Sequence, residues 1–149
     1  MIKLKKLLCL CLISLLFISG CDKKYNEGTF EGSAIDTYGG ENNTATAKIE
    51  IDENGKITSV YLDTTYTKDG VSTTKKQLKD DYGMYNHPYG SEVGEWYQQV
   101  EALEQAIVEN QGIEFLNLDE DGYTDAVSSC TIKVDALIEA FENALNKAK

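Results

Sequence analysis

A run of hydroxyl side chains occurs near the carboxyl end of the chain, in the sequence DAVSSCT from Asp125 to Thr131. The run precedes a segment with helical periodicity, so we expect Thr131 to lie at a helix N-terminus. Unpaired backbone N–H groups and the positive end of the helix dipole meet there and favour a phosphate. The run therefore predicts a site for a phosphate-bearing ligand. An ordinary helix cap, in which Ser128 or Thr131 accepts a backbone N–H, is the alternative.

A second candidate ligand-contacting segment is the loop KDDYGMYNHPYG, residues 79–90. Aromatic rings offer flat apolar surface, and glycine lets the backbone approach a ligand closely. We expect Tyr82, Met84 and Tyr85 to line the binding site for a planar ligand; a tyrosine-rich surface loop is the alternative. Trp96 follows on an apolar stripe, where it is either a core residue or a platform on which a ring stacks.

The first 20 residues predict export. Three lysines precede an apolar run, residues 7–18, which is the arrangement of a secretory signal peptide and is too short for a membrane-spanning helix. The run ends in the sequence ISGC, which matches the lipobox of bacterial lipoproteins, so we expect Cys21 to be lipidated. The predicted organisation is a signal peptide over 1–20, the lipidated cysteine and a tether over 21–26, and one domain over 27–149. The domain would be anchored by lipid to the outer face of the bacterial cell membrane.

Charge and cysteine content narrow the function classes. Removal of the signal peptide would leave 11 basic and 25 acidic residues, a net charge of −14, which argues against a nucleic-acid partner. Of four cysteines, two lie in the signal peptide and Cys21 is used for lipid, so Cys130 alone remains. That excludes a disulfide framework and a cysteine-based zinc site, and no metal site is expected. Cys130 is either a reactive thiol or a small buried residue.

The first half of the domain predicts antiparallel strands. Residues 29–37 form a first strand, and 44–52 alternate cleanly, with alanines and isoleucines at odd positions on the buried face. The sequence DENG, residues 52–55, predicts a tight turn into a partner strand over 57–63. Threonines and Tyr66 continue this strand toward another turn at Lys68-Asp69-Gly70.

The second half predicts two helices. A helix is expected from Ser91 to the Asn110–Gly112 stop, with acidic residues Glu92 and Glu95 in its first turn. Its buried stripe would comprise Val93, Trp96, Tyr97, Val100, Leu103 and Ile107. A second stripe predicts a carboxyl-terminal helix and comprises Val134, Leu137, Ile138, Phe141 and Leu145. The predicted fold class is α+β, an antiparallel sheet with two main helices packed on it.

The DAVSSCT run resembles the flavinylation motif of FMN-binding domains. These domains occur in the membrane electron-transfer subunits of Na+-pumping and Rnf-type complexes and in extracytoplasmic flavin lipoproteins. The family pattern reads Asp, two variable residues, Ser or Thr, Gly, Ala, then Thr or Ser, so that Asp125, Ser128 and Thr131 are in register. Ser129 and Cys130 stand where Gly and Ala are usual. The resemblance implies an FMN-binding-domain-like fold and a phosphoester between FMN and Thr131.

The domain's start also resembles this family. Its glycine–aromatic–glycine stretch reads Gly28-Thr-Phe30-Glu-Gly32, and its hairpin reads Gly55-Lys-Ile57-Thr-Ser-Val60. The resemblance covers about Tyr25 to Leu145. It implies an extracytoplasmic flavoprotein that carries electrons from a membrane donor, and we expect an electron carrier more than a turnover enzyme. Covalent attachment would require a flavin transferase that uses FAD. The alternative is an extracytoplasmic small-ligand-binding or sensory lipoprotein without a redox role.

Overall fold

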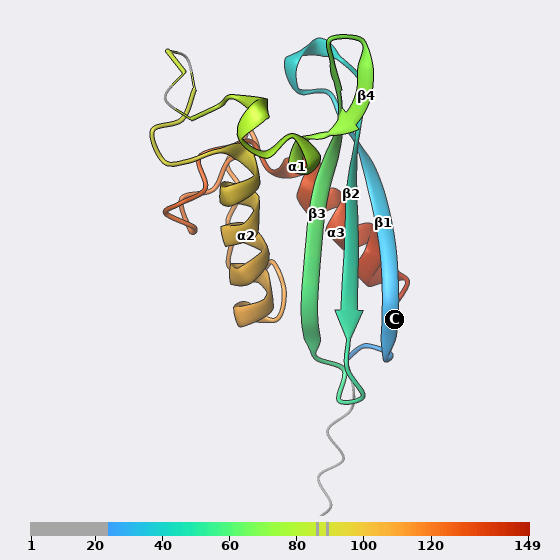
Figure 1. Ribbon diagram of the computed structural model, residues 1–149. Helices are drawn as coiled ribbons and strands as arrows, with labels where there is room; N and C mark the ends of the chain where they lie inside the picture. Colours follow the sequence, from blue (N-terminus) through green and yellow to red (C-terminus); the bar gives the residue numbers. More distant parts are fainter. Residues whose placement is uncertain (1–23, 86, 89) are drawn as a thin grey trace, which may run out of the picture.

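The computed structural model describes residues 24–85, 87–88 and 90–149, which form an α+β domain (Figure 1). Its four antiparallel strands follow the order β1-β2-β3-β4 and comprise β1 (Gly28–Asp36), β2 (Asn43–Ile51), β3 (Ile57–Lys68) and β4 (Val71–Thr74). The helices are α1 (Lys75–Leu78), α2 (Trp96–Asn110) and α3 (Asp135–Asn146), with 3-10 turns η1 (Tyr38–Gly40) and η2 (Lys79–Tyr82). The predicted α+β class is confirmed.

The predicted signal peptide, residues 1–20, and the predicted lipidation site Cys21 lie outside the described residues. Within the described residues, no helix is both long and apolar enough to cross a membrane. Part of the expected tether belongs to the fold, because Tyr25 is buried and the backbone N–H of Asn26 donates to Ala148 at 2.8 Å. The two ends of the described chain therefore meet beside the sheet.

The alternation of β2 confirms the predicted hairpin. Ala45, Ala47, Ile49 and Ile51 are buried, and the residues between them are exposed. The turn closes as Gly55 N donates to Asp52 O at 2.9 Å. β3 is longer than the expected strand and reaches Lys68, where a turn through Asp69 and Gly70 leads back into β4. This extension includes Thr64, which is buried, and Tyr66.

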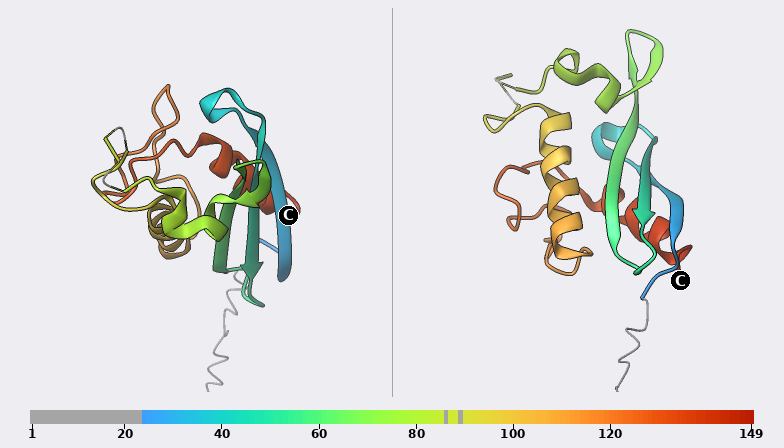
Figure 2. Two further views of the ribbon diagram at one scale, coloured as in Figure 1. Left: turned by 45° about the horizontal axis from the view of Figure 1, so that its top comes forward. Right: turned by 60° about the horizontal axis from the view of Figure 1, so that its bottom comes forward.

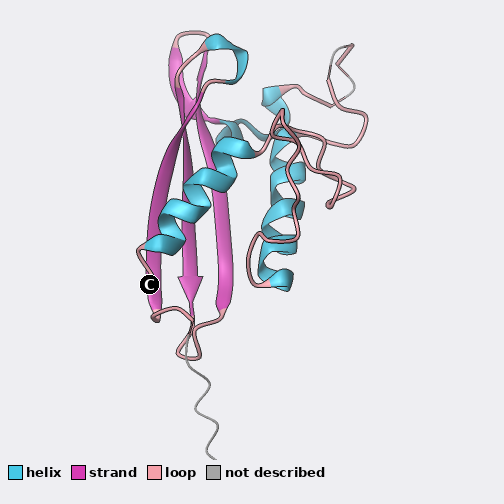
Figure 3. Ribbon diagram, turned by 180° about the vertical axis from the view of Figure 1, so that it is seen from behind, coloured by secondary structure: helices cyan, strands magenta, loops and turns pink. Residues whose placement is uncertain are grey.

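The face of the sheet that bears the buried residues of β2 is covered by α3, which crosses β1 and β2 (Figure 3). Phe141, Ile138 and Leu137 are buried in this layer, as the sequence pattern predicts. The helix approaches β1 closely at Gly32, where a Cβ atom would collide with the backbone of Ala140 and Ala144. Glycine at this position therefore sets the spacing between helix and sheet.

The helix α2 lies beside β3, along the strand edge that β2 leaves unpaired (Figures 1 and 3). Side chains of α2 and of its C-cap form hydrogen bonds with the backbone groups of that edge. The carboxylate of Glu104 accepts the Leu62 N–H at 2.5 Å, and the amide of Gln111 exchanges two bonds with the backbone of Ile57, at 2.9 and 3.0 Å. Because an uncovered edge is open to pairing with other strands, α2 protects the sheet as well as completing the core.

The start of α2 corrects the prediction. The helix begins at Trp96 and not at Ser91, so Val93 lies outside it and is 46% exposed. Gly94 has φ +155°, a backbone conformation that a helix does not continue through. Glu95 is the N-cap, and its N–H donates to the side chain of Gln98 at 2.9 Å. Residues 91–94 therefore form a loop that is free to contribute to a site.

Candidate functional site

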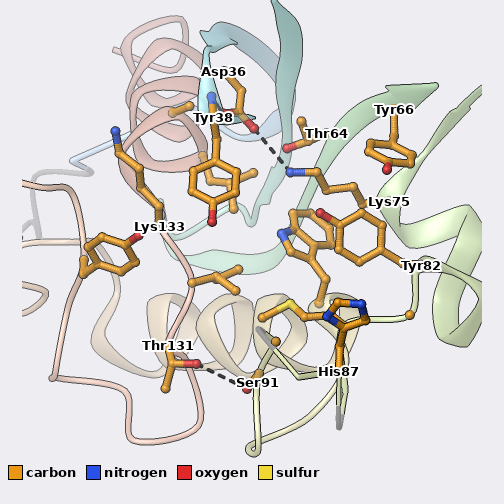
Figure 4. Close-up of a pocket in the computed structure, with 18 residues that line it drawn as sticks. Asp36, Tyr38, Thr64, Tyr66, Lys75, Tyr82, His87, Ser91, Thr131 and Lys133 are labelled. Carbon is orange, nitrogen blue, oxygen red and sulfur yellow. Dashed lines mark hydrogen bonds and ion pairs between the residues drawn. The ribbon is translucent and has the colours of Figure 1, made fainter. Parts of the chain in front are cut away.

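The loops before α2 and before α3 come together beside the end of the sheet (Figure 2). A cavity of about 390 Å³ opens between residues of these loops and of the sheet (Figure 4). Its walls come from the ends of β1 and β3, from η1 and α1, from the loop after η2, and from the first residues of α2 and α3. Segments far apart in the sequence thus supply one surface. The volume falls within the roughly 300–1,000 Å³ typical of small-molecule sites.

Aromatic side chains form one wall. The ring of Tyr82 meets Tyr66 edge-on at 5.2 Å and Trp96 at 6.5 Å between centroids. Trp96 is 4% exposed, so it belongs to the core and also contributes to the cavity lining. Burial raises the pKa of Tyr82 to about 12, so its hydroxyl remains a hydrogen-bond donor at neutral pH. Such a wall suits a flat ring ligand.

Lys75 places a buried cation at this wall (Figure 4). Its ammonium lies 3.5 Å from the carboxylate of Asp36, 5.2 Å from the centroid of Trp96 and 5.8 Å from that of Tyr82. Burial lowers the pKa of Lys75, and Asp36 opposes that shift. The backbone N–H of Lys76 donates to Asp63 of β3 at 3.1 Å, which anchors α1 and with it the neighbouring Lys75.

Thr131 lies on the opposite side of the cavity, beside Ser91 (Figure 4). The buried amide of Gln99, on α2, organises this side. Its oxygen accepts the Thr131 N–H at 2.8 Å and the Thr131 hydroxyl at 3.1 Å. Its nitrogen donates to Ser91 Oγ and to Gly94 O, both at 2.9 Å. One side chain therefore fixes the hydroxyl that the motif singles out and the loop facing it.

The loop after η2 is held by Glu95, the N-cap of α2. Its two carboxylate oxygens accept the N–H groups of Met84 and Tyr85, at 2.9 and 2.8 Å. The Ser91 N–H closes the loop by donating to Met84 O at 3.1 Å. The acidic residue expected to favour the helix dipole therefore also positions a cavity wall.

The structure brings together four of the site residues that the sequence predicts. Tyr82, Met84, Trp96 and Thr131 line the cavity. The other predicted site residues do not line the cavity. Tyr85 is 49% exposed and Cys130 is buried. The remaining motif residues are exposed, namely Asp125, Ser128 and Ser129. Burial raises the pKa of the Cys130 thiol, which disfavours the reactive thiolate.

The expected position of Thr131 at a helix N-terminus is wrong. The N-cap of α3 is Val134, whose backbone N–H is held by Gly122 O at 2.8 Å, and the helix begins at Asp135. Neither Thr131 nor Ser128 caps α3, so the ordinary-cap alternative is wrong as well. The first turn of α3 nevertheless reaches the cavity through Ala136 and Leu137.

Sequence reasoning missed Lys75, Asp36, Gln99 and Ser91. Lys75 stands in the sequence TTKK, which reads as an exposed helix start, and Gln99 has no feature that separates it from Gln98. Their roles depend on the packing of α1 and α2 against β3. Ser91 alone had a local signal, since it borders the glycine- and tyrosine-rich loop.

Comparison of the chain with models of protein families, with curated proteins and with solved structures found no match.

Proposed function

We propose that the protein is a membrane-anchored, extracytoplasmic flavoprotein that carries electrons and binds FMN through a phosphoester at Thr131, in an FMN-binding-domain-like fold. One observation carries the proposal. The hydroxyl at the acceptor position of the motif lies in the same cavity as the Tyr82–Trp96 wall and the Lys75 ammonium. The cavity thus combines an attachment point, a surface for a ring and a cation, which are the groups that FMN requires.

The charge of the lining supports an anionic ligand. The acidic and lysine residues that line the cavity are one carboxylate, Asp36, and two ammonium groups, Lys75 and Lys133. The whole chain has the reverse balance, with 25 acidic and 14 basic residues. Each lysine has a carboxylate partner, Asp36 for Lys75 and Asp135 for Lys133, so the lining is close to neutral. It is therefore less acidic than the chain as a whole, which favours an anionic ligand there over the rest of the surface.

The residues that replace the usual Gly and Ala fit the loop. Cys130 is 2% exposed, and its N–H donates to Val127 O at 2.9 Å, so a small side chain suffices there. Ser129 is exposed and has space for its hydroxymethyl group. The Thr131 hydroxyl lies beside Ser91 Oγ, at 3.4 Å, and donates to the Gln99 amide at the rim formed by the cavity lining (Figure 4).

Bound FMN would supply one- and two-electron redox chemistry, and the chain would supply attachment, orientation and surroundings. Thr131 would hold the phosphate, Gln99 would orient the Thr131 hydroxyl, and Tyr82, Met84 and Trp96 would exclude water from the ring. A lipid anchor at Cys21 would keep the carrier near a membrane electron donor and raise its effective concentration. Maturation would need a flavin transferase that uses FAD.

The test is flavin loading of protein produced together with a flavin transferase. We expect flavin absorbance and in-gel fluorescence after denaturation, lost in Thr131→Ala and partly kept in Thr131→Ser. Ser128→Ala should weaken loading at most, and Asp125→Ala should impair it. Flavin that binds but is lost on denaturation would exclude the phosphoester. Absence of any flavin would favour the small-ligand-binding or sensory lipoprotein instead.

A further inference from the structure

The ammonium of Lys75 has unused hydrogen-bonding capacity inside the cavity. Lys75 is 5% exposed, and among the described residues its hydrogen-bond acceptor is Asp36, at 3.5 Å. An ammonium has three donors, and burying a charge without good partners is costly. The remaining contacts are faces of aromatic rings, with Tyr38 at 6.0 Å in addition to Trp96 and Tyr82. Two N–H donors are therefore available to a ligand.

The position of Lys75 separates it from the attachment point. Figure 4 shows Lys75 beside Asp36 and Thr64, across the cavity from Thr131 and Ser91. The other lysine of the lining, Lys133, already pairs with Asp135 at 2.9 Å. If Thr131 holds the phosphate, Lys75 is positioned to contact the opposite end of the ligand.

We propose that Lys75 binds the hydrogen-bond-accepting edge of a planar heteroaromatic ring and so fixes which way the ligand lies in the cavity. The inference rests on the proposed function: in FMN the accepting edge is the pyrimidine side of the ring system. The aromatic wall would hold the flat face of the ring, and the Lys75 ammonium would donate to its ring nitrogen and carbonyl oxygen. Thr131 and Lys75 would thus hold the two ends of one molecule.

The experiment measures binding of FMN and of riboflavin, which lacks the phosphate, to purified protein made without a flavin transferase. Hydrogen bonds from a charged donor contribute about 1.5–3 kcal/mol, so Lys75→Met should weaken both ligands by about tenfold or more, and by the same factor. Lys75→Arg keeps the charge and should restore much of the binding. Lys48→Gln, on the exposed face of β2, removes one positive charge away from the cavity and should change neither affinity.

The outcomes distinguish this inference from the proposed function. Equal weakening of FMN and riboflavin, with the melting temperature of Lys75→Met close to that of the parent, supports the ring contact. Weakening of FMN alone would assign Lys75 to the phosphate and overturn the inference, as would unchanged binding of both. If the parent protein binds neither ligand, the cavity does not hold the ring by itself and the ring contact is overturned, whereas the proposed function is decided separately by flavin loading in the presence of the transferase.

Discussion

Gln99 is the residue on which the geometry of the attachment point depends. Its buried amide makes four hydrogen bonds, two to Thr131 and one each to Ser91 and Gly94. Hydrogen bonds lost in a buried site leave their partners unsatisfied, and each such partner costs free energy. The amide therefore stabilises the fold and also orients the hydroxyl.

Replacing Gln99 with Met should lower the free energy of unfolding by about 2–4 kcal/mol, because backbone groups of Thr131 and Gly94 lose their partners. Covalent flavin loading should fall in parallel. Gln105→Met is the matched control on α2, since Gln105 is exposed and bonds Glu109 on the same helix; its effect should stay within about 0.5 kcal/mol. Denaturant titration decides, and a loss below about 1 kcal/mol for Gln99→Met would contradict the assigned role.

Two tyrosines should titrate late. Burial raises the pKa of Tyr82 from 10.0 to about 12. Tyr61 is 46% exposed, and its partial desolvation together with the carboxylates of Asp63 and Glu104 also raises its pKa to about 12, so the folded state keeps protons that the unfolded state releases. The stability that the folded state gains by keeping these two protons is fully present below about pH 10 and is lost as the pH rises toward 12. Phenolate absorbance after a pH jump should show a late step, which Tyr61→Phe and Tyr82→Phe should each reduce. A single step near pH 10 for all nine tyrosines would contradict both raised pKa values.

A bound ligand should affect the titration of only one of these two tyrosines. Tyr82 lines the cavity, and Tyr61 lies on β3 outside it. Flavin loading should therefore delay the titration of Tyr82 further and leave that of Tyr61 unchanged. The Tyr82→Phe variant provides the control, since in that protein the late step should not respond to flavin.

At the scale of elements, Gly32 sets how closely α3 lies on β1. A Cβ there would meet the backbone of Ala140 and Ala144, and backbone atoms cannot rotate away. Gly32→Ala should therefore destabilise the domain by about 2–3 kcal/mol, the upper part of the range for overpacking. Ser33→Ala, on the exposed face of the same strand, should cost no more than about 0.5 kcal/mol. Equal unfolding midpoints for the two variants would show that α3 is not seated as described.

Periodic elements were predictable from the sequence because their signals are local. The alternation in β2 and the stripe of α3 follow directly from which residues must be buried. The start of α2 was not predictable from periodicity alone, since Val93 fits the stripe although Gly94 ends the regularity before it. The continuation of β3 to the turn at Lys68 was expected from its threonines and Tyr66, whereas β4, which pairs with that continuation, was not predicted.

The candidate site was predictable only in part. Thr131, Tyr82 and Met84 stand in unusual local sequences, and all three line the cavity. Lys75 and Gln99 act through contacts with residues 39 and 32 positions away in the chain, Asp36 and Thr131, and nothing in their neighbouring sequence indicates those partners. Side chains whose role depends on such long-range packing cannot be found by motif.

At the scale of the whole molecule, the fold begins close to the proposed anchor. Tyr25 is buried and Asn26 bonds Lys149, so the described fold already includes part of the predicted tether. Cys21→Ser should release the protein from the membrane and leave its melting temperature unchanged, because the substituted residue precedes the folded part. Membrane fractionation checks this, and retention of Cys21→Ser in the membrane fraction would refute lipid anchoring at that cysteine.

The central claim is that Thr131 carries FMN, and intact-mass spectrometry tests it most directly. Protein produced with a flavin transferase should be heavier than the bare chain by one FMN less one water, and Thr131→Ala should have the mass of the bare chain. Peptide mapping should place the adduct on Thr131. A parent protein at the bare mass, or the same adduct on Thr131→Ala, would contradict the account.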